Sequence, residues 1–204
     1  MKKKTTGARL PADKRRAITV QAVLDLAAVG NPAEITTGAI ADRMQITQGA
    51  LFRHFETKDA IWQAVIEWVT KRVLTRVDEA TRTTKSPLEA LQAVFMAHIE
   101  SHVRRPGVPR IVFGELQRTG DTPTKRMVRT FMGRYVERLQ SLIEQAKVQG
   151  EIATDVDTKA AATLFVGMVQ GLVVQSLVSG KIGIVRANAP EVFAIYLRGI
   201  RRRP

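Results

Sequence analysis

The sequence predicts an all-α fold of about nine helices. Apolar residues recur at three- and four-residue intervals through each ordered segment, which is the spacing of one face of a helix. Signals that begin and end helices flank these segments, such as the capping box and proline of Ser86-Pro87-Leu88-Glu89 and the glycine at Gly150. No stretch has a convincing strand pattern, and no internal repeat or low-complexity tract is present.

Length and composition are compatible with one sizeable core or with a small domain followed by a larger one. The chain has 204 residues, of which 45% are hydrophobic, so there is ample material for a buried interior. We expect residues 1–57 to form an N-terminal arm and a three-helix domain, and residues 58–204 a larger helical domain. A helix over about residues 58–78 would link the two domains.

The small domain has the spacing of a helix-turn-helix. A helix over residues 11–29 comes first, with one apolar stripe. The next helix is expected to have Thr37 as its N-cap and to end near Met44. Only residues 45–47 separate it from a second short helix, over residues 48–55. Helices joined in this way form the motif whose second helix is placed in a DNA major groove.

Cap and breaker residues divide the larger domain into six helices. Ser86-Pro87 begins one helix, Thr122-Pro123 begins another, and Asp157 is a good N-cap for a helix that is apolar around most of its circumference. The expected helices span about residues 58–78, 86–105, 108–118, 122–150, 158–178 and 191–200, with a glycine-containing loop over residues 179–190.

The stretch from Thr36 to Ala60 has a distinctive residue pattern. It consists of Thr37, Ile40, Ala41, the run from Ile46 to Phe52, the pair His54-Phe55 and the run from Thr57 to Ala60. This pattern resembles the DNA-binding segment of the TetR family of bacterial transcription regulators. The match is strong for roughly residues 13–70, and beyond them it depends on length and helical layout.

Three positions depart from the family pattern. Gln45 stands where a glycine is usual, Ala50 where a threonine is common, and Phe52 where a tyrosine is more usual. If Gln45 must adopt a left-handed conformation, it costs about 1 kcal/mol relative to glycine. Phe52 cannot give a phosphate the hydroxyl hydrogen bond of a tyrosine. The operator sequence therefore cannot be transferred from a relative.

The second short helix supplies the predicted DNA contacts. Gln48 and Arg53 are expected to read bases, because amide and guanidinium groups suit adenine and guanine edges. The backbone of Gly49 could approach DNA closely, because glycine has no side chain. Lys58 begins a helix whose free amides favour anions, so it is a candidate phosphate contact; the alternative is that Lys58 is an ordinary exposed lysine. By the resemblance, His54 faces the DNA backbone. The predicted DNA-binding residues are Thr37, Gln48, Gly49, Ala50, Phe52, Arg53, His54 and Lys58.

Charge is concentrated at the two ends of the chain. The formal net charge is +13, residues 1–16 hold seven Lys or Arg against one Asp, and residues 198–204 add four Arg. A basic arm before a helix-turn-helix can contact phosphates without sequence preference, and Lys14, Arg15 and Arg16 are better candidates than Lys2–Lys4. The alternative is a solvated tail that aids solubility.

The resemblance implies that the larger domain binds a small-molecule effector and forms a two-fold dimer. Gly167 and Gly171 lie four residues apart on an apolar helix, where a helix of a second subunit could approach closely; the alternative is the central core helix of the monomer. Soft or aromatic residues suited to an apolar effector pocket, or alternatively plain core, are Met96, Phe113, Phe131, Met132, Tyr135 and Met168.

Enzymatic and metal chemistry find little support in the sequence. There is no glycine-rich phosphate loop, nucleotide fingerprint or nucleophile elbow, so we predict that the protein is not an enzyme and needs no cofactor. His98 and His102 have metal-ligand spacing with Glu115 as the nearest third ligand, but we favour exposed or core-edge histidines over a metal site. Cysteine is absent, which excludes disulfides and thiolate sites.

The predicted function is a homodimeric repressor that a small-molecule effector releases from a double-stranded DNA operator. The longest apolar run, from Thr163 to Val178, is broken by Gly, Gln and Ser, and no signal segment follows the N-terminus, so we expect no membrane span and a cytoplasmic location. Two alternatives remain open: a DNA binder that organises the nucleoid, and a helical protein-interaction module.

Overall fold

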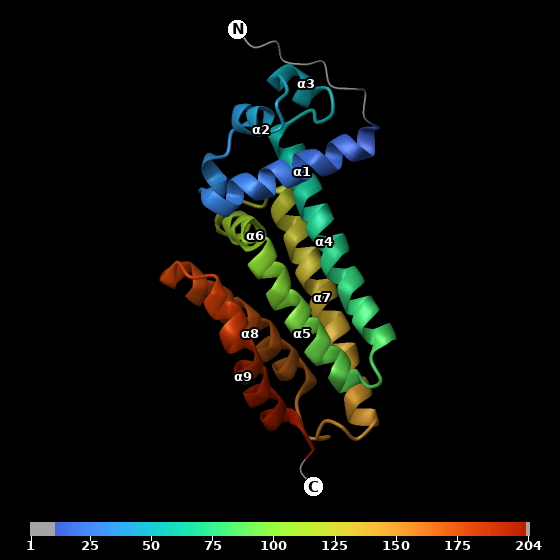
Figure 1. The fold of residues 1–204 in the computed structure, drawn as a ribbon. Coiled ribbons are helices and arrows are strands. Elements are labelled where there is room, and N and C mark those ends of the chain that lie inside the picture. Colours follow the sequence, from blue (N-terminus) through green and yellow to red (C-terminus); the bar gives the residue numbers. More distant parts are fainter. Residues whose placement is uncertain (1–10, 203–204) are drawn as a thin grey trace. The chain divides into compact units, whose positions relative to one another are not determined.

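The structure is a computed structural model that describes residues 11–202. Over these residues the chain folds into nine α-helices and one short 3-10 helix, which confirms the all-α prediction (Figure 1). Their bounds are α1 Ala12–Val29, η1 Pro32–Glu34, α2 Thr37–Arg43, α3 Gln48–Phe52, α4 Lys58–Thr83, α5 Pro87–Arg104, α6 Gly107–Gln117, α7 Pro123–Val148, α8 Thr158–Ser179 and α9 Gly183–Ile200.

The described residues form two compact units. Residues 11–70 and 105–129 make up the first unit, and residues 71–104 and 130–202 make up the second. The long helices α4 and α7 each contribute residues to both units, since the divisions fall after Thr70 and after Arg129. The first unit therefore contains α6 as well as the helix-turn-helix, and the expected division of the sequence at residue 57 stays a prediction.

In the first unit, α1 packs against α6 at very close range. A Cβ atom added to Gly107, the first residue of α6, would lie 2.2 Å from the carbonyl oxygen of Leu24 and 3.1 Å from the amide nitrogen of Ala28. Backbone meets backbone there, so no side chain larger than hydrogen fits. The contact anchors α6 to the helix that supports α2.

Threonine hydroxyls begin three consecutive helices of this unit. Thr36 Oγ1 accepts a hydrogen bond from Ala39 N at 3.0 Å, Thr47 Oγ1 accepts one from Ala50 N at 3.1 Å, and Thr57 Oγ1 accepts one from Ala60 N at 3.0 Å. The prediction that Thr37 caps α2 was wrong by one residue. Thr36 has the extended backbone of an N-cap, which aims its hydroxyl at the amide three residues on, whereas Thr37 is already helical.

The turn between α2 and α3 depends on a left-handed residue. Gln45 has φ +58°, and it is the one non-glycine residue with positive φ in the described part of the chain. The turn places Ile40 and Ala41 of α2 in one buried core with Leu51 of α3. Gln45 thus has the conformation for which glycine is preferred, at a cost of about 1 kcal/mol.

Aromatic side chains hold the second unit together. The Phe95 ring of α5 lies 5.6 Å from that of Phe165 on α8 and 4.9 Å from that of Phe193 on α9. The Tyr196 hydroxyl donates a hydrogen bond to the carbonyl of Ala161 at 3.1 Å. Because these rings come from three helices, they fix α5, α8 and α9 as one packed group.

The last helix begins well before its expected position. The sequence predicted a loop over residues 179–190, whereas α9 starts at Gly183 and contains Pro190 in its interior. Proline removes one helical hydrogen bond, but Pro190 lies on the exposed side of α9. Val185 and Ala189 on the opposite side are buried, so their packing offsets the lost bond.

By length and composition α8 could cross a bilayer, because its mean hydropathy reaches 1.7 over an 18-residue window. This criterion uses length and composition alone, so the expectation that no helix spans a membrane stays a prediction. A helix that packs within a unit can have the same composition, and 39% of this window is buried against the rest of the molecule.

Candidate nucleic-acid interface

The short helix α3 has one buried apolar side and one exposed polar side, as a helix that enters a DNA groove requires. Leu51 and, one turn later, Phe55 are buried beneath it, with exposed fractions of 1% and 3%. Gln48, Gly49 and Arg53 lie on the opposite, exposed side. In Figure 1, α2 and α3 lie next to each other beyond α1, so this exposed side is not covered by the other helices of the unit.

The structure brings together two of the predicted DNA-binding residues. Gln48 Nε2 donates a hydrogen bond to Thr37 Oγ1 at 2.6 Å, across the turn between α3 and α2. The bond fixes the orientation of the Gln48 amide before any ligand arrives. A preordered amide loses less side-chain entropy when it meets a base edge.

His54 is held by α1. Arg15 Nη1 lies 3.0 Å from His54 Nε2, and since a guanidinium can only donate, the imidazole nitrogen accepts. Arg16 is also engaged, because its guanidinium lies 3.3 Å from a carboxylate oxygen of Glu67 and 5.4 Å from the Phe55 ring centroid. Sequence reasoning missed these contacts because they join residues between 39 and 51 positions apart.

The remaining predicted contacts of α3 are open to solvent. No atom lies within 4 Å of a Cβ built on Gly49, and Ala50 is half-buried. Phe52 is 40% exposed, and Arg53 forms the C-cap of α3 with an exposed side chain. Of the basic arm, Lys14 is exposed at the start of α1, while Lys2–Lys4 lie outside the described residues.

Lys58 has a different environment from the one expected of a simple phosphate ligand. It begins α4 and is half-buried, with its ammonium 5.9 Å from the ring centroid of Trp62. It also borders a cavity of about 440 Å³ in the first unit. A phosphate contact would therefore require the Lys58 side chain to leave the indole ring.

The second unit contains a small, mostly apolar cavity with a few polar groups at its wall. Tyr135 OH and His98 Nδ1 are 2.9 Å apart, beside a cavity of about 10 Å³ that Val73, Arg76, Val77 and Val94 also line. Arg76 Nη1 donates to the carbonyl of Ala97 at 3.3 Å. A volume of this size holds about one water molecule.

Burial determines the protonation states at this site. Burial raises the pKa of the Tyr135 hydroxyl far above its ordinary value, so the hydroxyl keeps its proton and donates. Burial, followed by the positive charges of His102 and Arg76, lowers the pKa of His98 well below 6.5. The neutral His98 therefore accepts at Nδ1, while His102 Nδ1 donates to the His98 carbonyl at 2.9 Å.

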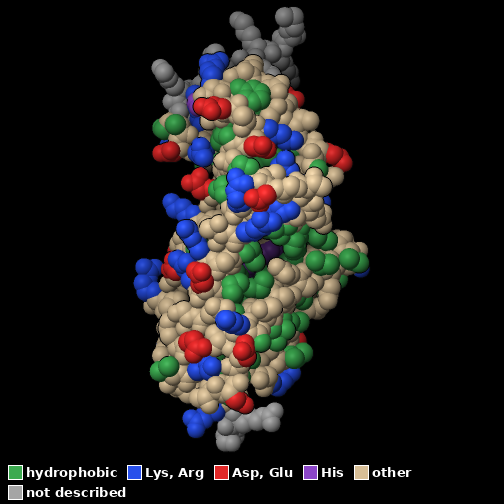
Figure 2. Space-filling model, turned by 180° about the vertical axis from the view of Figure 1, so that it is seen from behind, with side chains coloured by type: hydrophobic (Ala, Val, Ile, Leu, Met, Phe, Trp, Pro, Cys, Tyr) green, Lys and Arg blue, Asp and Glu red, His purple; other side chains and the backbone are tan. Residues whose placement is uncertain are grey.

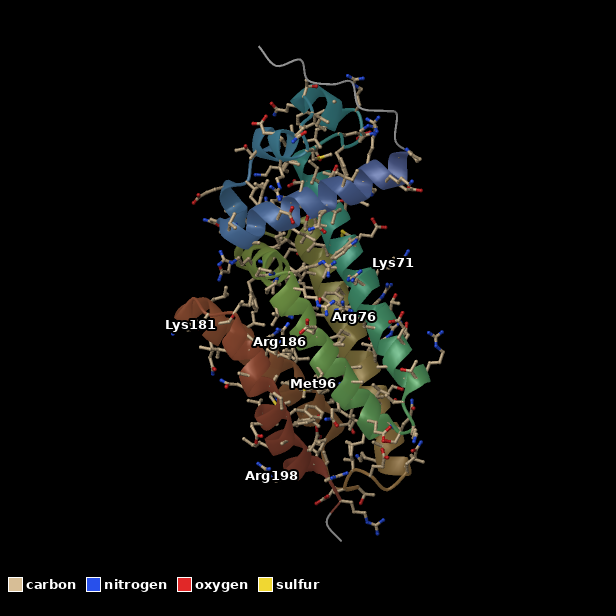
Figure 3. All side chains as sticks on the ribbon, in the orientation of Figure 1. Lys71, Arg76, Met96, Lys181, Arg186 and Arg198 are labelled. Carbon is tan, nitrogen blue, oxygen red and sulfur yellow. The ribbon has the colours of Figure 1, made fainter. Side chains whose placement is uncertain are left out.

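The six predicted pocket residues are not gathered around this cavity. Tyr135 lines it, but Phe113 belongs to the first unit, and Met96 lies on α5 outside the cavity lining (Figure 3). Phe131, Met132 and Met168 are likewise absent from the lining. Sequence reasoning missed His98 and Arg76, although a histidine on a mostly apolar helix face was a usable signal.

The histidine pair does not form a metal centre with Glu115. His98 and His102 belong to the second unit, with ring centroids 4.7 Å apart, whereas Glu115 belongs to the first. Over residues 11–202, no group of three or more His, Cys, Asp or Glu side chains is arranged to hold a metal ion.

Apolar side chains are exposed along α8 and α9. Figure 2 shows them gathered on the side of the molecule that these two helices form. Gly167 and Gly171 are exposed among them, and no atom lies within 4 Å of a Cβ built on either glycine. The large exposed members are Leu164, Val174, Leu177, Val178 and Ile195. We call this surface the α8/α9 stripe.

A helical chain whose first unit presents the second helix of a helix-turn-helix with an exposed polar face is a DNA-binding protein of the helix-turn-helix class. Residues 20–65 match the family described as bacterial regulatory proteins, tetR family, and residues 84–174 match the tetracyclin repressor-like C-terminal domain. The chain belongs to the TetR family of DNA-binding transcriptional regulators. Regulators of this family are not enzymes, which confirms that prediction.

Individual relatives are distant. The nucleoid occlusion factor SlmA of Vibrio campbellii is 23% identical over 137 residues, which cover 67% of this chain and 70% of SlmA. A TetR transcriptional regulator of Chloroflexus aurantiacus has a TM-score of 0.77 at 19% identity, covering 94% and 98% of the two chains. FadR of Bacillus subtilis, solved in complex with stearoyl-CoA, has a TM-score of 0.78 at 16% identity, covering 91% and 99%.

Proposed function

We propose that the protein is a homodimeric transcriptional repressor. Its two α3 helices would enter successive major grooves of a palindromic operator, about 34 to 36 Å apart. The observation that carries this proposal is the exposed polar face of α3 above the buried Leu51. Acting on the chromosome, the protein would work in the cytoplasm.

Gln48 and Arg53 are the proposed base readers. Both are exposed, and the hydrogen bond from Gln48 to Thr37 already orients the Gln48 amide. Amide and guanidinium groups match the hydrogen-bonding edges of adenine and guanine. The open backbone of Gly49 would allow close approach, and the residues proposed to contact or border the DNA backbone are Thr37, Ala50, Phe52, His54 and Lys58.

The α8/α9 stripe is the proposed dimer contact. Its side chains include Val178, which is 84% exposed, and Val174 and Leu177, which are about half-exposed on the same helix. A second copy would remove this apolar surface from water, at a gain of about 25 cal/mol per Å². Gly167 and Gly171 leave room for a helix of the partner to approach closely, which supports the same contact.

The site around His98 and Tyr135 is the proposed effector site. Because its cavity of about 10 Å³ admits no more than a water, an effector must displace side chains as it enters. FadR, which has the same fold, binds stearoyl-CoA, and this supports an apolar effector with polar groups that meet Arg76, His98 or Tyr135. The α4 helix spans both units and would transmit the change to α3.

The test of this function replaces Arg53. Arg53→Ala should weaken binding to the operator by about 1 to 3 kcal/mol and spare binding to unrelated DNA, because a base contact carries specificity. Gel shifts with the DNA upstream of the protein's own gene are the first assay, and Arg82→Ala, an exposed arginine of α4 in the second unit, is the matched control. Equal loss on both DNAs would show that Arg53 contacts phosphate instead.

A second candidate is a DNA-bound role in organising the nucleoid. The observation that favours it is the similarity to the nucleoid occlusion factor SlmA. Such a protein would occupy many dispersed chromosomal sites and ignore small molecules, whereas a local repressor would occupy few sites near regulated genes. Genome-wide mapping of bound DNA separates the two. A third candidate, a protein-interaction module, predicts no salt-dependent affinity for DNA.

A further inference from the structure

The proposed repressor function uses Lys58 as a DNA contact but gives no role to the cavity beside it. It has a volume of about 440 Å³, within the range of small-molecule sites, and its lining comes from η1, the first turns of α4 and the C-terminal half of α6. All of these elements belong to the first unit. It is therefore separate from the small cavity at His98 and Tyr135, which lies in the second unit.

One wall of the cavity carries a buried carboxylate. The Glu115 side chain is only 7% exposed, and its Oε1 accepts from Arg118 Nη1 at 3.1 Å. The same Arg118 nitrogen lies 3.8 Å from Asp59 Oδ1, at the upper limit of an ion pair. Arg118 therefore neutralises the charge of Glu115 at close range and the charge of Asp59 only weakly.

The α4 side of the cavity carries a cation and an anion that are both weakly paired. Lys58 and Asp59 are consecutive at the start of α4, and both line the cavity. Among the described residues Lys58 has no carboxylate within 4 Å and contacts the Trp62 ring instead, while the one ion-pair partner of Asp59 is Arg118. Beside the closely paired Arg118 and Glu115, the cavity thus offers an incoming ligand one cation, Lys58, and one weakly paired carboxylate, Asp59.

The rest of the lining is partly apolar. Trp62 and Ile111 are buried at its base, and Pro32 contributes from η1. A ligand with only a positive group would leave Lys58 without a carboxylate, and a ligand with only a negative group would leave Asp59 with no cation closer than Arg118 at 3.8 Å. A ligand with adjacent ammonium and carboxylate groups and an apolar side chain satisfies both charges and the apolar surface.

We propose that this cavity binds a small zwitterion of the α-amino-acid type with an apolar side chain. The ligand carboxylate pairs with the Lys58 ammonium, which leaves the indole ring. The ligand ammonium pairs with the Asp59 carboxylate. The apolar side chain lies against Trp62 and Ile111.

The sequence itself supplies a reporter for the test. The chain has two tryptophans, Trp62 in the cavity and Trp68 further along α4, so Trp68→Phe leaves Trp62 as the sole indole. The full-length Trp68→Phe protein is titrated with L-valine, L-leucine, L-isoleucine, L-methionine and L-phenylalanine while Trp62 emission is followed. Each amino acid is compared with its own decarboxylated amine and its own deaminated acid.

We expect saturable changes for at least one amino acid, with the matching amine and acid binding at least about tenfold more weakly, since each lacks one charge-assisted contact. In the same background, Lys58→Met should abolish the preference over the amine, and Asp59→Asn the preference over the acid. Lys71→Met, an exposed lysine on the same helix (Figure 3), should change neither preference.

Three results would overturn the proposal. One is the absence of a saturable response to all five amino acids at about 10 mM, a concentration that reveals millimolar affinity. Another is binding of an amine or acid as tight as that of its parent amino acid. The third is an unchanged preference in both Lys58→Met and Asp59→Asn. Because the assay contains no DNA, its outcome is independent of the repressor function.

Discussion

At the scale of single residues, Gln45 has the clearest backbone strain. Its φ of +58° belongs to the left-handed region, where a Cβ atom meets the following carbonyl. Gln45→Gly should therefore raise the free energy of unfolding by about 1 kcal/mol. Urea unfolding followed by circular dichroism measures the change.

The matched control is Gln92→Gly, at an exposed position within α5, which should lower the free energy of unfolding by about 1 kcal/mol. If Gln45→Gly destabilises the protein as well, the Gln45 side chain makes a compensating contact that the backbone strain does not reveal.

Residue-level prediction from sequence succeeded where one residue type has one physical role. Asp157 was expected to cap α8, and its side chain accepts from Ala160 N at 2.7 Å. Between the adjacent threonines Thr36 and Thr37, however, only the backbone angles decide which hydroxyl reaches the free amide. The bond from Arg15 to His54 could not be predicted, since it depends on how α1 packs against the helix-turn-helix unit.

At the scale of helices, the closest approach is that of α6 to α1. Gly107→Ala would place a Cβ atom 2.2 Å from the Leu24 carbonyl oxygen, so the backbones of α6 and α1 would have to move apart. We expect a loss of about 2 to 4 kcal/mol in the free energy of unfolding, measured by urea or thermal unfolding.

Gly133 provides the control for this prediction. It lies in α7 with no atom within 4 Å of an added Cβ, so Gly133→Ala should be neutral or stabilise by up to about 1 kcal/mol. Equal effects of the two substitutions would mean that helix propensity, rather than the contact of α6 with α1, determines the result.

The α8/α9 stripe gives a second prediction at this scale. Val174→Glu places a charge in the proposed dimer contact, so the protein should shift from dimer to monomer in analytical ultracentrifugation. Val148→Glu, at an 87% exposed position at the end of α7, should leave the assembly unchanged. A Val174→Glu protein that stays dimeric would remove the stripe from the interface.

Helix starts were predicted accurately where a capping residue stands directly before a proline, and wrongly where a proline lies inside a helix. Ser86-Pro87 and Thr122-Pro123 begin α5 and α7 as expected. The start of α9 was placed too late because Pro190 was taken as a boundary. Burial of Val185 and Ala189 on the other side of the helix outweighs the missing hydrogen bond, and burial depends on neighbours that the local sequence does not specify.

At the scale of the whole molecule, two half-buried histidines link stability to pH. Burial, and then the charges of His102 and Arg76, lowers the pKa of His98 in the folded state well below 6.5, and burial also lowers the pKa of His102. Below about pH 6.5 the unfolded chain therefore binds protons that the folded chain does not, so the free energy of unfolding should fall as the pH drops. Urea midpoints at about pH 7.5 and 5.5 measure this fall.

The double variant His98→Gln/His102→Gln should show a smaller fall over the same pH range, because glutamine does not titrate. His54→Gln, which replaces the exposed third histidine, is the control for histidine removal as such. If the double variant keeps the same pH dependence, the loss of stability at low pH comes from carboxylates and not from these histidines.

The fold and the position of the DNA-binding helices could be predicted because periodicity, caps and the short turn at Gln45 are local features. The sites in the two units could not. The pairing of His98 with Tyr135 joins residues 37 positions apart, and the cavity beside Lys58 is built from η1, α4 and α6. Methionine and aromatic residues indicate apolar packing, but the sequence does not specify which of them line a cavity. Five of the six predicted pocket residues therefore lie outside the lining of the cavity around Tyr135.

The open surroundings of Gly49 have a practical consequence. A cysteine placed there would be the sole thiol in a chain that has none, and its Cβ would have no described atom within 4 Å, which leaves room to attach a nitroxide. In an assembly of two copies, electron spin resonance between the two labels would then read out the separation of the paired α3 helices directly, both before and after a candidate small molecule is added.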